Sequence, residues 1–307
     1  MDILAQQIFN GLVLGSIYAV VALGYTMVYG ILELINFAHG EITMMGAMVA
    51  ISVIGMGLAA GLPALPLILL AMLAAIAVCM CLGLAIERFA YRPLRHAPRL
   101  APLITAIGMS ILLQNIAMLI WGKQYIPFPP VFPQGEHRLL GAHVTDVQLI
   151  ILATTLLLML ALTLLVQRTP LGRAMRAIAQ SQPVAQLMGV NVNRVVAATF
   201  AIGSALAAVA GVLVAANYGQ AHYYMGFLLG LKAFSAAVLG GIGNIAGAML
   251  GGLLLGLIES LGAGYIGPLT HGFLGSNYQD VFAFFVLILV LVFRPSGLLG
   301  ERVVERA

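Results

Sequence analysis

Charged residues are scarce in this sequence. Asp, Glu, Lys and Arg make up 8% of its 307 residues, whereas 62% are hydrophobic and the mean hydropathy is +1.07. A soluble domain carries roughly 25% charged residues, so a water-soluble core of this size cannot account for so much apolar surface. The solvent for most of the chain is therefore a lipid bilayer.

Several motifs are also missing. There is no Gly-x-x-x-x-Gly-Lys-Ser/Thr, and the only Gly-Lys pair, Gly122-Lys123, is followed by Gln124. His-Glu-x-x-His and Gly-x-Ser-x-Gly do not occur. The two cysteines, Cys79 and Cys81, lie within one apolar run, which favours reduced thiols that act as small hydrophobic groups. We therefore expect no enzyme activity, no catalytic residue, no cofactor and no metal site in this chain.

The apolar runs predict the fold class. They are continuous, as at 149–166 and 281–293, whereas the strands of a membrane barrel alternate apolar and polar residues. The sequence thus predicts an all-α fold, a polytopic transmembrane helical bundle, and we treat residues 1–307 as a single transmembrane domain. The candidate spans are 8–30, 40–58, 64–86, 101–121, 147–166, 196–216, a glycine-rich stretch at 226–264, and 279–293.

Arginine positions predict the orientation. Most cations lie in the loops 87–100 and 167–195 and in the tail after residue 293, and the positive-inside rule places all three in the cytoplasm. This rule explains the net charge of +4 better than nucleic-acid binding does. The stretch 226–264 must then cross twice, with a break at Gly240-Gly241-Ile242-Gly243, or re-enter. We expect nine spans, or equally eight with one re-entrant segment, and an N-terminus outside.

Small residues recur at four-residue spacing along several spans. One series is Gly243, Gly247 and Gly251, and others are Gly252 with Gly256 and Gly11 with Gly15. Small faces allow helix backbones to approach closely in lipid. Packing within this chain is the favoured interpretation, and a dedicated dimer interface is the alternative.

Isolated polar residues inside the spans are candidates for a translocation path, since such residues are costly in lipid. The candidates are Tyr18, Asn36, His39, Glu41 and Asn115. The segment 36–41 is equally explained as a turn that caps the next span. For Tyr18 and Asn115, as for Gln114 and Glu259, hydrogen bonding between helices is the default interpretation.

The loop 167–195 predicts two short helices, one amphipathic over 171–179 and a second that starts at Pro183 and ends at Gly189. Proline suits a first helical turn and glycine accepts the left-handed position after a helix. Such a pair indicates a docking surface, although a helix that lies on anionic headgroups is the alternative.

Longer stretches resemble a known family. They include Gly15-Ser16-Ile17-Tyr18-Ala19, Ile35-Asn36-Phe37-Ala38-His39-Gly40-Glu41, Glu87-Arg88, Tyr91-Arg92-Pro93, and Ala237-Val238-Leu239-Gly240-Gly241-Ile242-Gly243. Together they resemble the LivH-type permease of branched-chain amino acid ABC transporters, over nearly the whole chain.

The resemblance implies a multi-pass protein of the bacterial inner membrane that imports Leu, Ile or Val. It implies as partners a second homologous permease subunit, two ATP-binding cassette subunits that bind the ATP, and a periplasmic branched-chain amino acid binding protein. In the family a cytoplasmic loop contacts the ATPases. The matching residues here are Gly172, Arg173, Arg176, Pro183, Ala185, Leu187, Met188 and Gly189.

Within this loop Ala185-x-x-x-Gly189 resembles the core of the general ABC importer loop, but Val184 and Gln186 stand where a glutamate is frequent. Two other functions remain as alternatives: an ion-coupled secondary amino-acid transporter and a membrane-embedded enzyme.

Overall fold

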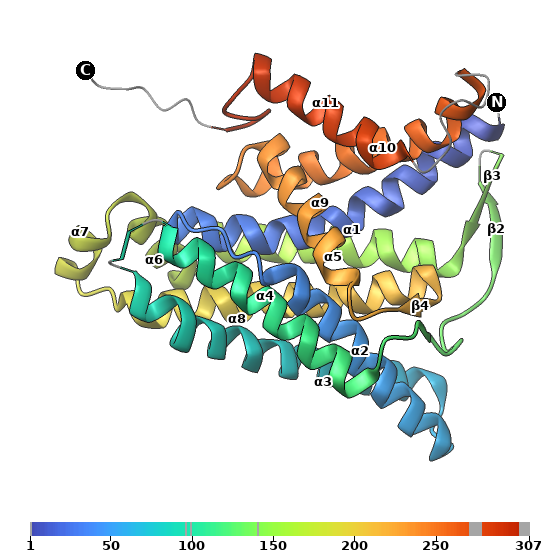
Figure 1. Cartoon of the computed structure of the whole chain (residues 1–307), viewed down its shortest axis with the longest axis horizontal. Coiled ribbons are helices and arrows are strands. Elements are labelled where there is room, and N and C mark those ends of the chain that lie inside the picture. Colours follow the sequence, from blue (N-terminus) through green and yellow to red (C-terminus); the bar gives the residue numbers. More distant parts are fainter. Residues whose placement is uncertain (1, 96, 99, 140, 270–277, 301–307) are drawn as a thin grey trace.

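The computed structural model describes residues 2–95, 97–98, 100–139, 141–269 and 278–300, which form a bundle of helices with two small pairs of strands (Figure 1). The long helices are α1 (Asp2–Leu32), α2 (His39–Ala59), α3 (Ala64–Ala85), α4 (Leu100–Trp121), α5 (Asp146–Arg168), α8 (Val192–Tyr218) and α10 (Ile245–Leu269). The shorter ones are α6 (Pro170–Gln180), α7 (Gln182–Leu187), α9 (Met225–Gly240) and α11 (Gln279–Phe293). The predicted all-α bundle is confirmed.

The membrane-crossing helices follow the predicted spans. Seven helices in the described residues are long and apolar enough to cross a membrane, and α9 and α11 are shorter apolar helices. Helix α3 continues to Leu94 through the π-helical turn η1 (Ile86–Tyr91) and the short η2 (Arg92–Leu94). The predicted break is present, because α9 ends at Gly240 and α10 begins at Ile245.

The two ends of the bundle differ. In Figure 1 the helices α6 and α7 lie at the left end, whereas the N-terminus and the strands β2 (Glu136–Leu139) and β3 (Ala142–Thr145) lie at the right end. The left end holds the arginine-rich loops and is the expected cytoplasmic end. We call the left end the inner end and the right end the outer end.

Helices α1 and α10 touch backbone to backbone. A Cβ atom at Gly256 would lie 2.2 Å from the backbone nitrogen of Gly15, and one at Gly252 would lie 2.5 Å from that of Ala19. Only glycine permits this approach, and it gives helices in lipid the dispersion contacts that hold them together. The small-residue face is therefore an interface within the chain.

The other glycine series packs α10 against α9. A Cβ at Gly251 would lie 2.0 Å from the Ala236 carbonyl oxygen, and one at Gly247 would lie 2.5 Å from that of Gly240. Gly243, which the sequence placed on the same face, lies instead in the turn between the helices. Its φ is 94° and a Cβ there would meet no atom within 4 Å, because the turn needs a left-handed residue at this point.

The tail closes the inner end of α9. The amide of Leu298 donates to the Leu239 carbonyl, and that of Leu299 donates to the Gly240 carbonyl, both at 2.9 Å. Asn244 in the turn before α10 donates to the Leu299 carbonyl, also at 2.9 Å. The last carbonyls of a helix lack partners within it, so the tail satisfies them here.

Helix α2 begins inside the bundle, about two turns short of the inner end of α1. Its first residue, His39, contacts α1 so closely that a Cβ at Gly24 would lie 2.2 Å from the His39 Nε2 atom. Gly24 lies roughly 12 Å from the end of α1, at a rise of 1.5 Å per residue. Residues 33–36, which are not helical, therefore return the chain into the bundle.

Two strand pairs organise the outer end. The strands β2 and β3 form an antiparallel hairpin, and Gln6 of α1 bonds to both backbone groups of His143 in β3. The short strands β1 (Ile126–Pro127) and β4 (Gln220–Ala221) pair antiparallel. The pairing ties the loop after α4 to the loop after α8.

Replacing Gly256 tests the α1–α10 contact. We expect Gly256→Leu to lower the unfolding midpoint and the yield of monodisperse protein in detergent, because overpacking costs about 1–3 kcal/mol or more. The matched control is Gly108→Leu, since a Cβ at Gly108 in α4 meets no atom within 4 Å. Equal stability of the two variants would show that α1 and α10 do not touch in this way.

Labelling with an impermeant thiol reagent tests the orientation. In a chain with Cys79→Ala and Cys81→Ala, we expect Gln134→Cys to react in intact spheroplasts and Gln180→Cys to react only after lysis. Both glutamines are exposed, Gln134 before β2 and Gln180 at the end of α6. The reverse pattern would invert the topology.

Candidate functional site

The predicted coupling loop begins with a tight turn from α5 into α6. Thr169 caps α6 by accepting a hydrogen bond from the Gly172 amide at 3.1 Å. A Cβ at Gly172 would lie 2.1 Å from the Val166 carbonyl oxygen, so α6 leaves α5 at backbone contact. Arg173 is exposed, and Arg176 donates to the Val166 carbonyl.

Helix α7 projects from the inner end of the bundle, the expected cytoplasmic end. Pro183 lies in its first turn, and Ala185 anchors it with 3% exposure. After the helix Gly189 has a φ of 83°, and the Val190 amide bonds back to the Ala185 carbonyl at 3.0 Å.

The solvent-exposed side of α7 carries large apolar side chains. Leu187 is 87% exposed and Met188 is 80% exposed, and Val184 next to them is also exposed. We call these three residues the α7 tip. Large apolar side chains held on a capped helix at the end of a bundle form a surface that another protein or a membrane can cover.

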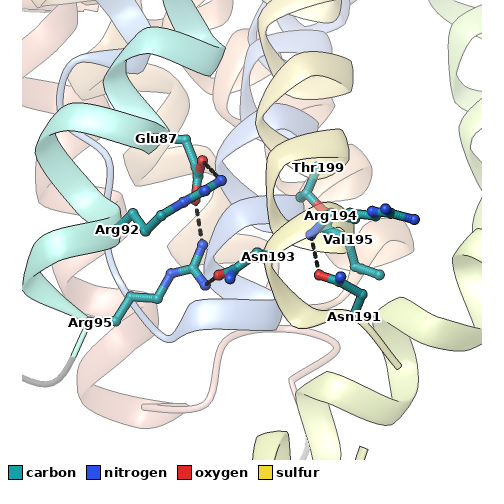
Figure 2. A network of polar contacts seen from close by, with 8 residues as sticks. All are labelled: Glu87, Arg92, Arg95, Asn191, Asn193, Arg194, Val195 and Thr199. Carbon is teal, nitrogen blue, oxygen red and sulfur yellow. Dashed lines mark hydrogen bonds and ion pairs between the residues drawn. The ribbon is translucent and has the colours of Figure 1, made fainter. Parts of the chain in front are cut away.

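A buried charge network connects the helices at the inner end of the bundle (Figure 2). Glu87 of η1 is almost fully buried and forms ion pairs with Arg92, at 2.7 Å, and with Arg95. Arg95 also donates to the Asn193 side chain in α8 at 2.7 Å. Burial lowers the pKa of the Arg95 guanidinium, an effect that the Glu87 charge opposes. The network fixes the end of α3 to the start of α8.

This network lies beside α7. A cavity of about 350 Å³ is lined by Arg92, Arg95, Gln182, Gln186 and residues 190–193. Asn191 caps α8 by accepting a hydrogen bond from the Arg194 amide at 3.1 Å (Figure 2). Movement of α7 would therefore reach α8 through a short, hydrogen-bonded connection.

The candidates Asn36, His39 and Glu41 are all buried, but they face different neighbours. The Asn36 side chain accepts from the Ala38 amide and from the Tyr91 hydroxyl, both at 3.1 Å. His39 stands edge-on to the Tyr25 ring, at 4.9 Å between centroids. The structure thus holds the start of α2 in place through these side chains.

Glu41 faces α4. Its Oε1 atom accepts hydrogen bonds from Ser110, at 3.1 Å, and from Gln114, at 2.7 Å. Asn115 is exposed on the same helix, and its amide donates to the Ile111 carbonyl at 2.8 Å. Asn115 and Glu41 are therefore not brought together.

Tyr18 belongs to a separate cluster. Its hydroxyl donates to Glu259 of α10 at 2.9 Å, and Glu259 pairs with Lys232 of α9 at 2.7 Å. Lys232 also pairs with Asp280 of α11 at 2.7 Å. Tyr18 and Lys232 line a cavity of about 300 Å³. Of the five path candidates, only Tyr18 lines either of the two cavities described here.

The hydrogen bond between Tyr18 and Glu259 agrees with the interpretation of both as residues that bond between helices. The pairing of Glu259 with Lys232, and of Lys232 with Asp280, was not predicted. A signal was available, because opposite charges within otherwise apolar helices are expected to find each other in a bilayer. Sequence spacing alone does not say which charges pair, since the partners lie on three helices.

Comparison with known proteins places the chain in a family. The sequence model of the family described as "Branched-chain amino acid transport system / permease component" matches residues 7–291 of this chain. The high-affinity branched-chain amino acid transport system permease protein BraD of Pseudomonas aeruginosa is 50% identical over 306 residues, which cover 98% of this chain and 97% of that protein.

Two further relatives span the chain. The high-affinity permease protein LivH of Escherichia coli strain K12 is 47% identical, with 98% of this chain and 97% of that protein covered. A probable LivH permease of Methanocaldococcus jannaschii is 27% identical, with 97% and 94% covered. No solved structure gives a significant match.

Removing Glu87 tests the buried network. We expect Glu87→Ala to lower the stability of the chain by about 3 kcal/mol, because it leaves the Arg95 charge buried without its partner. Thermal unfolding in detergent measures the change, and Glu136→Ala at an exposed position in β2 is the control. A midpoint equal to that of the control would mean that the network does not stabilise the cytoplasmic end.

Proposed function

The chain belongs to the family of permease components of branched-chain amino acid transport systems, and we propose that it is the membrane-spanning subunit of an ATP-driven importer of Leu, Ile or Val in the bacterial inner membrane. It is a transport permease and not an enzyme. The Pseudomonas aeruginosa BraD and the Escherichia coli LivH, which match this chain over nearly their full length, are high-affinity branched-chain amino acid transport permeases. This similarity supports the substrate class.

Energy must come from other chains. The sequence holds no phosphate-binding loop for ATP, so two ATPase subunits would bind the nucleotide and pass motion to the permease. A second homologous permease and a periplasmic binding protein would complete the assembly. The permease itself would need no cofactor.

The α7 tip is the observation that supports this proposal. A surface that receives mechanical force has to project, and it has to be fixed to what it moves. Pro183 and Gly189 define the two ends of α7, Ala185 anchors it, and Leu187 and Met188 remain exposed. Contacts of a helix in a groove depend on a few such apolar anchors.

The connection to the transmembrane region is direct. Asn191 begins α8 two residues after Gly189, and Asn193 holds Arg95. Helix α8 then runs without interruption to Tyr218. A push on α7 would therefore move α8 and, through the Glu87 network, the inner end of α3.

One experiment tests the proposal. The tagged chain is purified gently, its companions are identified, and ATPase stimulation by the loaded binding protein is measured together with leucine uptake in vesicles. We expect two ATPase chains and a second permease to accompany the wild-type chain. Their absence, or uptake that needs an ion gradient and no ATP, would contradict the proposal.

A charge on the α7 tip should uncouple the complex. We expect Leu187→Asp to reduce stimulated ATPase and uptake about tenfold or more, because a charge in an apolar groove costs more than 1.4 kcal/mol. Leu139→Asp is the matched control, since Leu139 is exposed in β2 at the opposite end. Wild-type activity of Leu187→Asp would favour a headgroup-bound α7 instead.

A further inference from the structure

The cavity at the outer end lies between α1, the outer end of α8 and the start of α9. Its wall includes the apolar side chains of Leu14, Ile17, Val214 and Leu229, and Tyr18 and Lys232 add polar atoms. With about 300 Å³, it is at the small end of ligand pockets in proteins. It suits a molecule the size of one amino acid and is too small for a peptide.

Aromatic residues from two outer loops line the same cavity. The β1–β4 pairing places Ile126 opposite Ala221, so Tyr125 stacks on His222 with ring centroids 4.5 Å apart. His222 in turn bonds to the Lys123 carbonyl oxygen at 3.1 Å. The rim of the cavity is therefore a built feature of the outer end, held by strand pairing.

Lys232 brings a charge to this cavity. Its ammonium group has three hydrogen-bond donors. It donates one to Glu259 at 2.7 Å and forms an ion pair with Asp280, also at 2.7 Å. Among the described residues no further acceptor bonds to this ammonium group, so it can bind another one. Lys232, Glu259 and Asp280 together carry a formal charge of −1 when all are ionised, so the cluster also attracts a cation.

Holding helices together does not explain this arrangement. A buried ion pair pays for the desolvation of both charges, and well-packed apolar side chains connect helices at least as well. In lipid the cost is larger, and ionisable groups within membrane-spanning helices commonly face a polar path. Here Tyr18 and Lys232 of the charged cluster line a cavity, and the helical wall around them is mainly apolar.

We propose that this cavity is a transit site for the zwitterionic form of an aliphatic amino acid. Lys232 binds the α-carboxylate, the excess negative charge of Glu259 and Asp280 attracts the α-ammonium, and the apolar wall takes the side chain. This inference rests on the proposed function, since the amino acid must be delivered at the outer end. It adds a site within the permease itself.

Filling the cavity tests the transit site. The complete transporter is reconstituted in proteoliposomes, and uptake of radiolabelled L-leucine from the loaded binding protein is measured together with ATP hydrolysis. We expect Leu229→Phe to lower the ratio of leucine transported to ATP hydrolysed about tenfold, because the ring occupies the space of the substrate side chain. The matched control is Leu73→Phe on the outward face of α3, which is 65% exposed.

Two further variants keep the test decisive. If Leu229→Phe fails to assemble, Val214→Phe on α8 fills the same cavity. Lys232→Gln should also lower the leucine-to-ATP ratio, whereas Lys123→Gln, at a residue that does not line the cavity, should not. A merely structural Lys232 would lower complex yield and leave the ratio per assembled complex at the wild-type value.

The outcomes separate the two proposals. Wild-type leucine-to-ATP ratios in assembled Leu229→Phe and Lys232→Gln complexes would overturn the transit site alone. A wild-type complex without binding-protein-stimulated ATPase would overturn the proposed function before any variant is compared.

Discussion

The backbone contact between α1 and α10 determines where the charged groups of the outer half lie. Because the backbones of Gly15 and Gly256 are in contact, the two helices run side by side with no side chain between them at this point, and Tyr18 meets Glu259. Helix α10 then presents Glu259 to Lys232 of α9. Hydrocarbon offers no hydrogen-bond partner to a carboxylate within the membrane, so Glu259 needs the partners that this packing supplies. The close approach of α1 and α10 brings Tyr18 within reach of Glu259 because no large side chains separate the two helices.

Much of this architecture could be predicted from the sequence. Hydropathy and arginine placement predict the spans, because lipid selects strongly for long apolar helices. The break at Gly240–Gly243 could be predicted too, since Gly241 and Gly243 adopt backbone angles that other residues avoid. The spacing of Gly247 and Gly251 predicts a packing face but cannot exclude Gly243, because the spacing does not show where the helix begins.

The arrangement of the polar residues could not be predicted. Asn36 and Glu41 are close in sequence, yet one bonds to η1 and the other to α4. Asn36 lies before α2 and Glu41 lies in its first turn, so the two side chains point to different helices. Asn115 is a polar residue within a membrane span, as a path residue would be, but its side chain bonds to its own helix. The pairing of Lys232 with Glu259 and Asp280 depends on tertiary packing, as does that of Arg95 with Glu87. The burial of each side chain distinguishes the paired residues from Asn115, and the sequence alone does not show which side chains are buried.

The hydrogen bonds between the tail and α9 have a mechanical consequence. Leu298 and Leu299 join the inner end of α9 to the chain that follows α11, and Lys232 joins the outer half of α9 to the start of α11 through Asp280. Helix α9 is thus joined to the α11 segment at both its inner end and its outer half. These links at both ends favour movement of α9 and α11 together in any opening at this side of the bundle.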